Sequence, residues 1–391
     1  MMFRAYFFQS NFWLSLLLIL IIIKNPLFIL FNFANIEIQN YYYYSYLILL
    51  AMIIFTIVFV KKHRGMMLRG LKTSLPITCL VLLGCLLTGA HKEIDESFGV
   101  LFFFMLIPFN LIQFFQKPFN IKLFLYTSIL VHYIIGLVVS YIFYITGLGY
   151  GADGMLASYS ISLPSSCILY LAIVESRKNK QLLYVLASFF GLYLTFQAGS
   201  RGALIPFMFA FFLGLVNKGV DRMKISLLLL LLIILYETSS YWMGLFSESR
   251  VVEAFSDGTL TSTSDRRQET WGPVINAIFR SPIFGWGCFS DRLFTMDNQW
   301  AHNLFLEVTC DFGFPIGIYF LSFLVIFVYK VCIKKHNRTI AVLFILSIPQ
   351  LLVSSSYLLS TYFWVFFGFV VFWYKNSSYF IYDNENLKIN K

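Results

Sequence analysis

The apolar residues of this chain gather in long continuous runs, separated by short polar segments. A helix needs about 20 apolar residues to cross a membrane, and in lipid only helices and closed barrels satisfy their own backbone hydrogen bonds. Because the runs are continuous rather than alternating, the pattern favours helices over a barrel. Twelve spans are predicted, at about 12–31, 43–60, 74–90, 97–115, 121–146, 156–174, 181–198, 203–216, 225–243, 303–329, 339–356 and 361–374.

Composition supports this interpretation. The 391 residues are 59% hydrophobic and only 12% charged, whereas soluble domains carry about 25% charged residues. The tyrosine run from Tyr41 to Tyr44 is typical of a membrane interface. We therefore expect an all-α polytopic membrane protein of about twelve transmembrane helices, forming a single integral membrane domain over residues 1–391.

The basic residues predict an orientation. With the N-terminus in the cytoplasm, 21 of the 29 Lys and Arg residues fall on the cytoplasmic side, 7 fall outside, and Lys24 lies in the first run. This bias follows the positive-inside rule and places both termini, including the tail 375–391, in the cytoplasm. The same distribution explains the net charge of +10 without nucleic acid. No cleavage site follows the first run, so we interpret it as a retained span.

The outer cations depart from that rule. Six of the seven are arginines, and five of the seven lie in one long loop, residues 244–301. The planar guanidinium matches two phosphate oxygens, so this loop indicates an anionic ligand at the outer face. The alternative is that a loop of this length escapes the charge rule, which would leave Arg250, Arg280 and Arg292 without a ligand.

A GSRG segment, Gly199 to Gly202, joins the seventh and eighth predicted spans. Its glycines permit a sharp turn, and Arg201 is expected to begin the eighth helix. There the free N–H groups and the positive end of the helix dipole would add to its charge and favour an anion. The alternative is an arginine that reaches towards lipid headgroups.

The outer loop contains a predicted amphipathic helix at about 265–280, capped by Ser262 to Ser264 and kinked by a proline. Its apolar face would consist of Trp271, Val274, Ile275 and Ile278. Arg267 lies one turn before Trp271; alternatively, it is an exposed arginine on a surface helix. The following SPIFGWG segment, 281–287, predicts a turn in which Gly285 and Gly287 allow close backbone approach.

His302 and Asn303 open the tenth predicted span. Asn303 is a candidate helix cap, and His302 is a candidate base because a histidine exchanges protons near neutral pH. Glu307, about one turn further on, is the second candidate base, since an acid inside a span indicates function. The alternative for His302 is an ordinary interfacial histidine.

These motifs, in this order, resemble the O-antigen polymerase and O-antigen ligase superfamily. The resemblance covers about residues 195–320. It comprises the SRG turn, Arg267-x-x-x-Trp271, the P-x-x-G-x-G turn from Pro282 to Gly287, His302-Asn303 with Glu307, and the DFGFPIG segment from Asp311 to Gly317.

The resemblance implies an enzyme of the bacterial inner membrane with its site facing the periplasm. Its reaction would be an inverting, metal-independent glycosyl transfer between undecaprenyl-diphosphate-linked sugars, with no cofactor. Arg201 and Arg267 would bind the diphosphate, His302 would orient or deprotonate the acceptor hydroxyl, and Arg266 could replace Arg267. Further substrate-binding residues are predicted at Glu307, Asn303, Trp271, Arg250 and Arg280.

Three functions remain open at this stage. We favour an O-antigen polymerase that joins lipid-linked repeats, with a chain-length regulator protein as a possible partner. An O-antigen ligase, which would transfer the glycan to lipid A-core, is the alternative. A lipid-linked oligosaccharide transporter is less favoured, because transporters often contain internal repeats, and the sequence has none that stands out.

Overall fold

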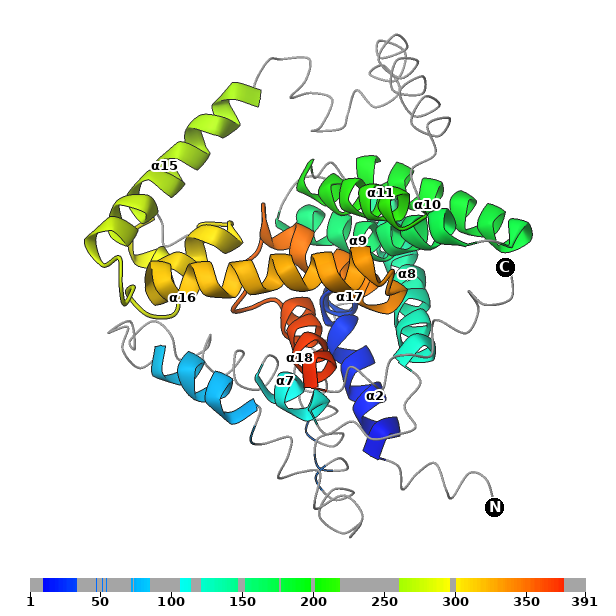
Figure 1. Ribbon diagram of the computed structural model, residues 1–391. Coiled ribbons are helices and arrows are strands. Elements are labelled where there is room, and N and C mark those ends of the chain that lie inside the picture. Colours follow the sequence, from blue (N-terminus) through cyan, green and yellow to red (C-terminus); the bar gives the residue numbers. More distant parts are fainter. Residues whose placement is uncertain are drawn as a thin grey trace.

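The structure is a computed structural model, and all the elements in its described part are helices (Figure 1). It describes residues 10–33, 47, 51, 54, 72, 74–84, 106–113, 121–146, 152–175, 177–197, 201–218, 260–295 and 300–375. In chain order, its elements are α2 (Ser10–Ile22), α3 (Lys24–Phe33), α7 (Ile107–Ile112), α8 (Ile121–Thr146), α9 (Ala152–Val174), α10 (Lys178–Gln197), η3 (Arg201–Leu204), α11 (Ile205–Lys218), α15 (Leu260–Arg280), η4 (Ser290–Leu293), α16 (Leu304–Val328), η6 (Tyr329–Lys334), α17 (Arg338–Leu351) and α18 (Thr361–Lys375).

Three described helical segments are long and apolar enough to cross a membrane. They are Ile121–Phe143, Ala157–Val174 and Leu304–Lys334; a fourth span is possible if α2 and α3, bent by 59° at their junction, act as one. The all-helical class is therefore confirmed for the described residues, which include three or four candidate membrane spans. The full set of twelve is not tested: the predicted span at 225–243 lies outside the described residues, as does that at 43–60 except for three single positions.

Helix α9 lies at the centre of one half of the molecule, packed against α8, α10, α11 and α17 (Figure 1). Its spanning window is 89% buried, so its neighbours, rather than lipid, cover most of its surface. Two buried serines of α9 satisfy their hydroxyls within the helix: Ser165 donates to the carbonyl of Ile161 at 2.5 Å, and Ser166 to that of Leu163 at 2.8 Å.

In the other half, α18 packs against α7 through Phe109, whose ring centroid lies 5.8 Å from that of Trp364 and 5.5 Å from that of Phe367. It packs against α17 through the rings of Phe366 and Phe344.

The first predicted span, 12–31, is bent rather than straight. It breaks between α2 and α3, where Pro26 in the first turn of α3 cannot donate a helical hydrogen bond. The hydroxyl of Tyr362 donates to the carbonyl of Ile22 at 2.9 Å. A side chain from α18 thus satisfies a backbone group at the break, as a low-dielectric environment requires.

Two predicted boundaries are wrong. The amphipathic helix begins at Leu260, so Ser262 to Ser264 lie inside α15 instead of capping it. Pro273 lies within the helix, as predicted. Ile275 is 38% exposed; the buried face of α15 consists of Val274, Ala277 and Ile278. The predicted span 339–356 ends at Leu351, and residues 352–360 form turns.

Candidate functional site

Helix α16 is interrupted at Gly313, and the SPIFGWG turn packs against the interruption. Gly313 has φ 75° and ψ 172°, which no helix accommodates. The N–H groups of Trp286 and Gly287 donate to the carbonyls of Cys310 and Asp311 at 2.8 and 2.9 Å, and the N–H of Phe314 donates to Pro282 at 2.7 Å. The turn therefore supplies the hydrogen bonds that the broken helix loses.

Glycine is required on both sides of this contact. A Cβ atom on Gly285, whose φ is +68°, would lie 2.5 Å from the carbonyl oxygen of Asp311. A Cβ atom on Gly313 would overlap the carbonyl of Ile283. The close approach predicted at Gly285 is confirmed, and its partner is the DFGFPIG segment of α16.

The same loop fixes the backbone directly before α16. One carboxylate oxygen of Asp291 accepts a hydrogen bond from the N–H of Ala301 at 2.8 Å. The indole N–H of Trp271 donates to the carbonyl of Ala301, also at 2.8 Å. Ala301 is thus held from both sides, by η4 and by α15, one residue before His302.

His302 adopts an unusual backbone conformation, with φ +51°. Non-glycine residues seldom adopt positive φ, and where they do, the surrounding contacts hold them there. Asn303 follows with an extended backbone, and its side chain accepts hydrogen bonds from the N–H groups of Phe305 and Leu306. The predicted cap is confirmed, and the hydrogen bonds made by Ala301 and those accepted by the Asn303 side chain fix the backbone on both sides of His302.

Three buried carboxyl groups lie beneath this turn: Asp291, Glu307 and Asp311, each at most 2% exposed. Asp311 accepts hydrogen bonds from the hydroxyls of Tyr357, at 2.5 Å, and Ser290, at 3.2 Å. Burial raises the pKa of Asp291, although the hydrogen bond from Ala301 opposes that shift. The cluster connects η4, α16 and the segment after α17 through polar contacts.

The segment 352–360 was missed at the sequence level, because it was assigned to a membrane span. The backbone N–H of Tyr357 donates to Glu307 at 3.1 Å, and its hydroxyl binds Asp311. At the other end, the hydroxyl of Ser354 donates to that of Tyr159 at 2.7 Å. Three consecutive serines, Ser354 to Ser356, were the signal that the span ends before them.

Tyr159 in turn contacts the SRG turn. A Cβ atom on Gly202 would collide with the Tyr159 hydroxyl, and the hydroxyl of Ser162 donates to the carbonyl of Ala203. A chain of contacts therefore runs from the turn that contains Arg201, through residues 352–360, to the first turns of α16.

The predicted arginines lie in separate parts of the chain, and the structure describes all of them except Arg250. Arg201 begins η3, as expected, and Arg266 and Arg267 lie in α15 about one turn before Trp271. Arg250 lies outside the described residues. Arg280 is exposed at the far end of α15, about 20 Å of helix rise from Arg267.

Arg292 was not selected as a site residue from the sequence. Its guanidinium carbon lies 4.1 Å from the ring centroid of Trp300, close to the Ala301–His302 turn. This cation–π contact fixes a positive charge beside the turn. In the sequence, the signal for this contact was Trp300, an aromatic residue directly before the AHN motif.

The apolar helices and the family match together identify a membrane protein. Residues 183–321 match the family model described as O-antigen ligase. This match covers α10, the SRG turn, α15 and the first part of α16, and it confirms the resemblance to the O-antigen polymerase and ligase superfamily. No curated protein and no solved structure matches the chain.

Proposed function

We propose that this protein is an O-antigen polymerase that joins undecaprenyl-diphosphate-linked repeats at the outer face of the inner membrane. The observation that carries the proposal is the turn at His302. Trp271 holds this turn through Ala301, and Arg267 lies one helical turn before Trp271. Helix α15, which contains Arg267, and the turn that contains His302 are thereby joined by one hydrogen bond.

In the proposed reaction, a hydroxyl oxygen of the acceptor sugar attacks the anomeric carbon of the donor glycan. A new glycosidic bond forms as the bond from that carbon to the diphosphate oxygen breaks. Configuration inverts because attack comes from the face opposite the leaving group. The hydroxyl proton passes to His302, and undecaprenyl diphosphate leaves with the bonding electrons.

Positive charge is needed where the diphosphate departs. We assign this role to Arg201 and Arg267, with Arg266 adjacent, since guanidinium groups bind two phosphate oxygens and stabilise developing negative charge. In this proposal the arginines provide the charge, without a metal ion or cofactor. Contacts of the sugars or diphosphate with Arg250 and Arg280 remain predictions.

The other predicted site residues have structural contacts that explain how they support His302. Trp271 and Asn303 fix the backbone on either side of it. Glu307 is 1% exposed and accepts a hydrogen bond from the N–H of Tyr357, so this carboxyl group is buried and binds the protein's own backbone. We therefore favour His302 over Glu307 as the base.

An O-antigen ligase is the second candidate, because the matching family model bears that description. Its acceptor would be lipid A-core instead of a second lipid-linked repeat. A deletion strain distinguishes the two: core capped with a single repeat indicates a polymerase, whereas uncapped core with polymer retained on the lipid carrier indicates a ligase.

The proposal is tested with purified protein and lipid-linked repeats in detergent. A polymerase lengthens the repeats there, whereas a transporter has no membrane to act across. A His302→Asn variant should abolish elongation, because asparagine tolerates positive φ but lacks the titratable ring. Full elongation by this variant, folded and at equal concentration, would remove His302 from the mechanism.

The proposed orientation needs its own test. A cysteine introduced in place of Ser256, in the predicted periplasmic loop, should react with an impermeant reagent in cells whose outer membrane is permeable. Reaction only after lysis of the inner membrane would invert the topology and contradict a periplasmic site.

A further inference from the structure

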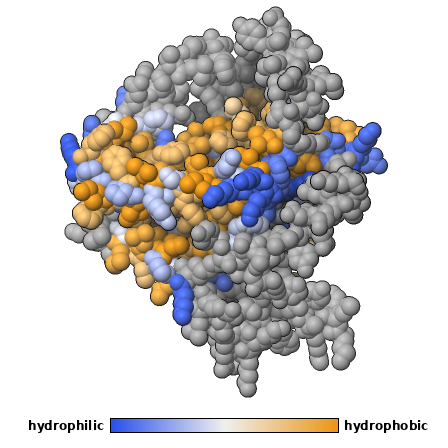
Figure 2. Space-filling view, in the orientation of Figure 1, coloured by the Kyte–Doolittle hydropathy of each residue, from blue (hydrophilic) through white to orange (hydrophobic). Residues whose placement is uncertain are grey.

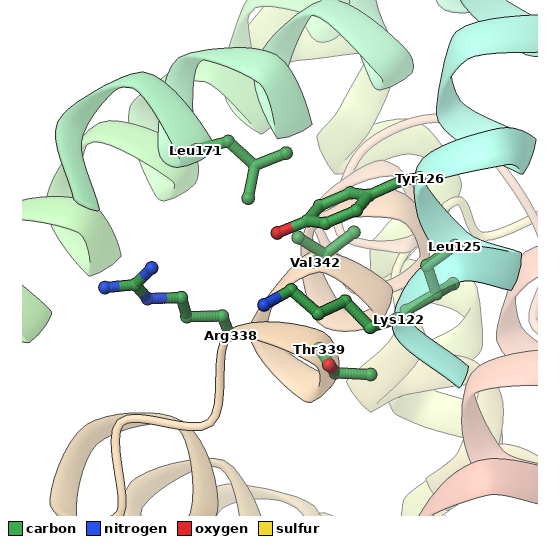
Figure 3. Close-up of a pocket in the computed structure, with 7 residues that line it drawn as sticks. All are labelled: Lys122, Leu125, Tyr126, Leu171, Arg338, Thr339 and Val342. Carbon is green, nitrogen blue, oxygen red and sulfur yellow. The ribbon is translucent and has the colours of Figure 1, made fainter. Parts of the chain in front are cut away.

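We propose that a second site, remote from His302, binds the phosphate of an anionic phospholipid. The site is a pocket between the first turns of α8 and α17 and the end of α9 (Figure 3). Its lining is made of Lys122, Leu125, Tyr126, Leu171, Arg338, Thr339 and Val342.

Two cations from different helices line this pocket. Lys122 lies in the first turn of α8 and Arg338 begins α17. Cations at helix starts are placed against the helix dipole, whereas an anion between them would interact favourably with both side chains and both helix ends. The pair of charges and the pocket itself, rather than either helix end alone, indicate an anionic ligand.

Hydroxyl groups supply further donors around the same space. Figure 3 shows the ammonium of Lys122 and the hydroxyl of Tyr126 directed towards a common region, and the ammonium lies 5.9 Å from the Tyr126 ring centroid. Thr339, only 7% exposed, also lines the pocket. An ammonium, a guanidinium and two hydroxyls line the pocket, and each donates hydrogen bonds that phosphate oxygens accept. In Figure 3 the guanidinium of Arg338 extends away from the ammonium of Lys122.

The chain segments next to two of the pocket-lining residues, Leu171 and Arg338, contain more cations than acids. Hydrophilic residues gather over the end of α16 and the start of α10 in Figure 2. Among the described residues between 170 and 181 and between 330 and 340, Glu175 is the single acid, against seven cations: Arg177, Lys178, Lys180, Lys330, Lys334, Lys335 and Arg338. Basic pockets between membrane helices are suited to anionic lipid headgroups.

An apolar stripe on α8 favours a lipid over free phosphate. Leu123, adjacent to Lys122, is 63% exposed, and Leu130, Ile134 and Val138 continue along the helix at 57, 51 and 44%. Their spacing of seven, four and four residues places them on one face. This face lies about a third of a turn around α8 from the side that lines the pocket, so the acyl chain of a lipid held there would pass Tyr126 to reach it.

This site lies away from the proposed chemistry. His302 precedes the start of α16, whereas Arg338 follows the other end of the α16–η6 segment, which is 31 residues long. In the proposed topology the pocket is on the cytoplasmic side. Phospholipid binding therefore does not depend on the reaction proposed for His302, and either proposal can fail without the other.

The test is native mass spectrometry of the delipidated full chain in detergent, titrated with phosphatidylglycerol. A double variant, Lys122→Gln with Arg338→Gln, should weaken binding by about tenfold or more, as expected for two basic contacts to a lipid phosphate. The matched control is Lys334→Gln with Lys335→Gln, which removes two exposed charges nearby that do not line the pocket. It should weaken binding by less than about threefold.

A Thr339→Val variant removes one hydroxyl at nearly constant volume and should also weaken binding, with an unchanged melting temperature. Equal losses in the two double variants would overturn the proposal, because they would indicate diffuse charge attraction. Phosphatidylcholine binding as tightly as phosphatidylglycerol would also overturn it. Displacement of the lipid by millimolar inorganic phosphate would identify a free-phosphate site and contradict the lipid assignment.

Discussion

Asp291 holds the backbone N–H of Ala301 through a 2.8 Å hydrogen bond, one residue before His302. Asp291 is 2% exposed, so this bond forms away from water. With the bond from Trp271 to the carbonyl of the same residue, it maintains the positive φ of His302. The orientation of the proposed base therefore depends on groups that need not touch the substrate.

Replacement of Asp291 by alanine leaves the N–H of Ala301 buried without its acceptor, which costs about 1–3 kcal/mol. We expect kcat for elongation to fall about tenfold or more, with a smaller change in the donor KM. Asp291→Asn retains an acceptor oxygen and should preserve most activity. Equal kcat values for Asp291→Ala and wild type would contradict the role of this hydrogen bond.

The stability of the protein should depend on the ionisation of Asp291. Burial raises its native pKa, so the native state binds its proton more tightly than the unfolded state. Stability from this group therefore increases as pH falls from neutral towards the ordinary value of about 3.9. The melting temperature of wild type relative to Asp291→Asn should rise over that range; a constant difference would contradict the raised pKa.

Trp271 and Trp286 form a matched pair for testing the indole bond. Both donate to backbone carbonyls, Trp271 to Ala301 at 2.8 Å and Trp286 to Ala277 at 2.7 Å. Trp271→Phe should lower kcat several-fold, because it releases the residue next to His302. Trp286→Phe loses a comparable bond, to Ala277, and should reduce stability with less effect on kcat. A similar kcat for the two variants would refute a special role for the bond from Trp271 to Ala301.

The glycines at the α16 interruption should not tolerate a side chain. Gly285→Ala and Gly313→Ala place a methyl group at positive φ against a backbone carbonyl, and each should lower the yield of folded protein. Gly272→Ala in α15 is the control, since apart from its chain neighbours and its own helix nothing lies within 4 Å of its added Cβ. The gain in helix propensity is opposed by the ring of Pro273, which disfavours a Cβ on the preceding helical residue, so the variant should change stability by about 1 kcal/mol or less; thermal melting in detergent measures all three.

Arg201→Lys keeps the positive charge at the start of η3 but loses the planar guanidinium, which can donate two hydrogen bonds to one phosphate group. We expect polymer formation to fall about tenfold or more if this side chain binds diphosphate, consistent with the loss of one charge-assisted contact. Arg177→Lys, an exposed arginine after α9, should leave it unchanged. Polymer of normal length and amount from Arg201→Lys would count against a phosphate role.

Much of the helical framework was predictable from local pattern. The ranges predicted at 121–146, 181–198 and 361–374 agree with α8, α10 and α18 within a few residues, because their apolar runs end at polar residues. The break at Gly313 was not predicted. An apolar run contains no local sign of such a break, because the hydrogen bonds that satisfy the interrupted backbone come from a hydroxyl or a turn elsewhere in the sequence.

The features of the candidate site also separate into those that the sequence predicted and those that only the tertiary structure showed. The sequence by itself determined the membrane class, the glycine-rich turns, the Asn303 cap and the order of the motifs, since each follows from local composition or spacing. Only the tertiary structure decided that Asp291 and Trp271 meet at Ala301, and that Tyr357 reaches Glu307 and Asp311. These contacts join residues 10 to 50 positions apart, and their partners are selected by packing and by the need to satisfy buried polar groups, which no local pattern encodes.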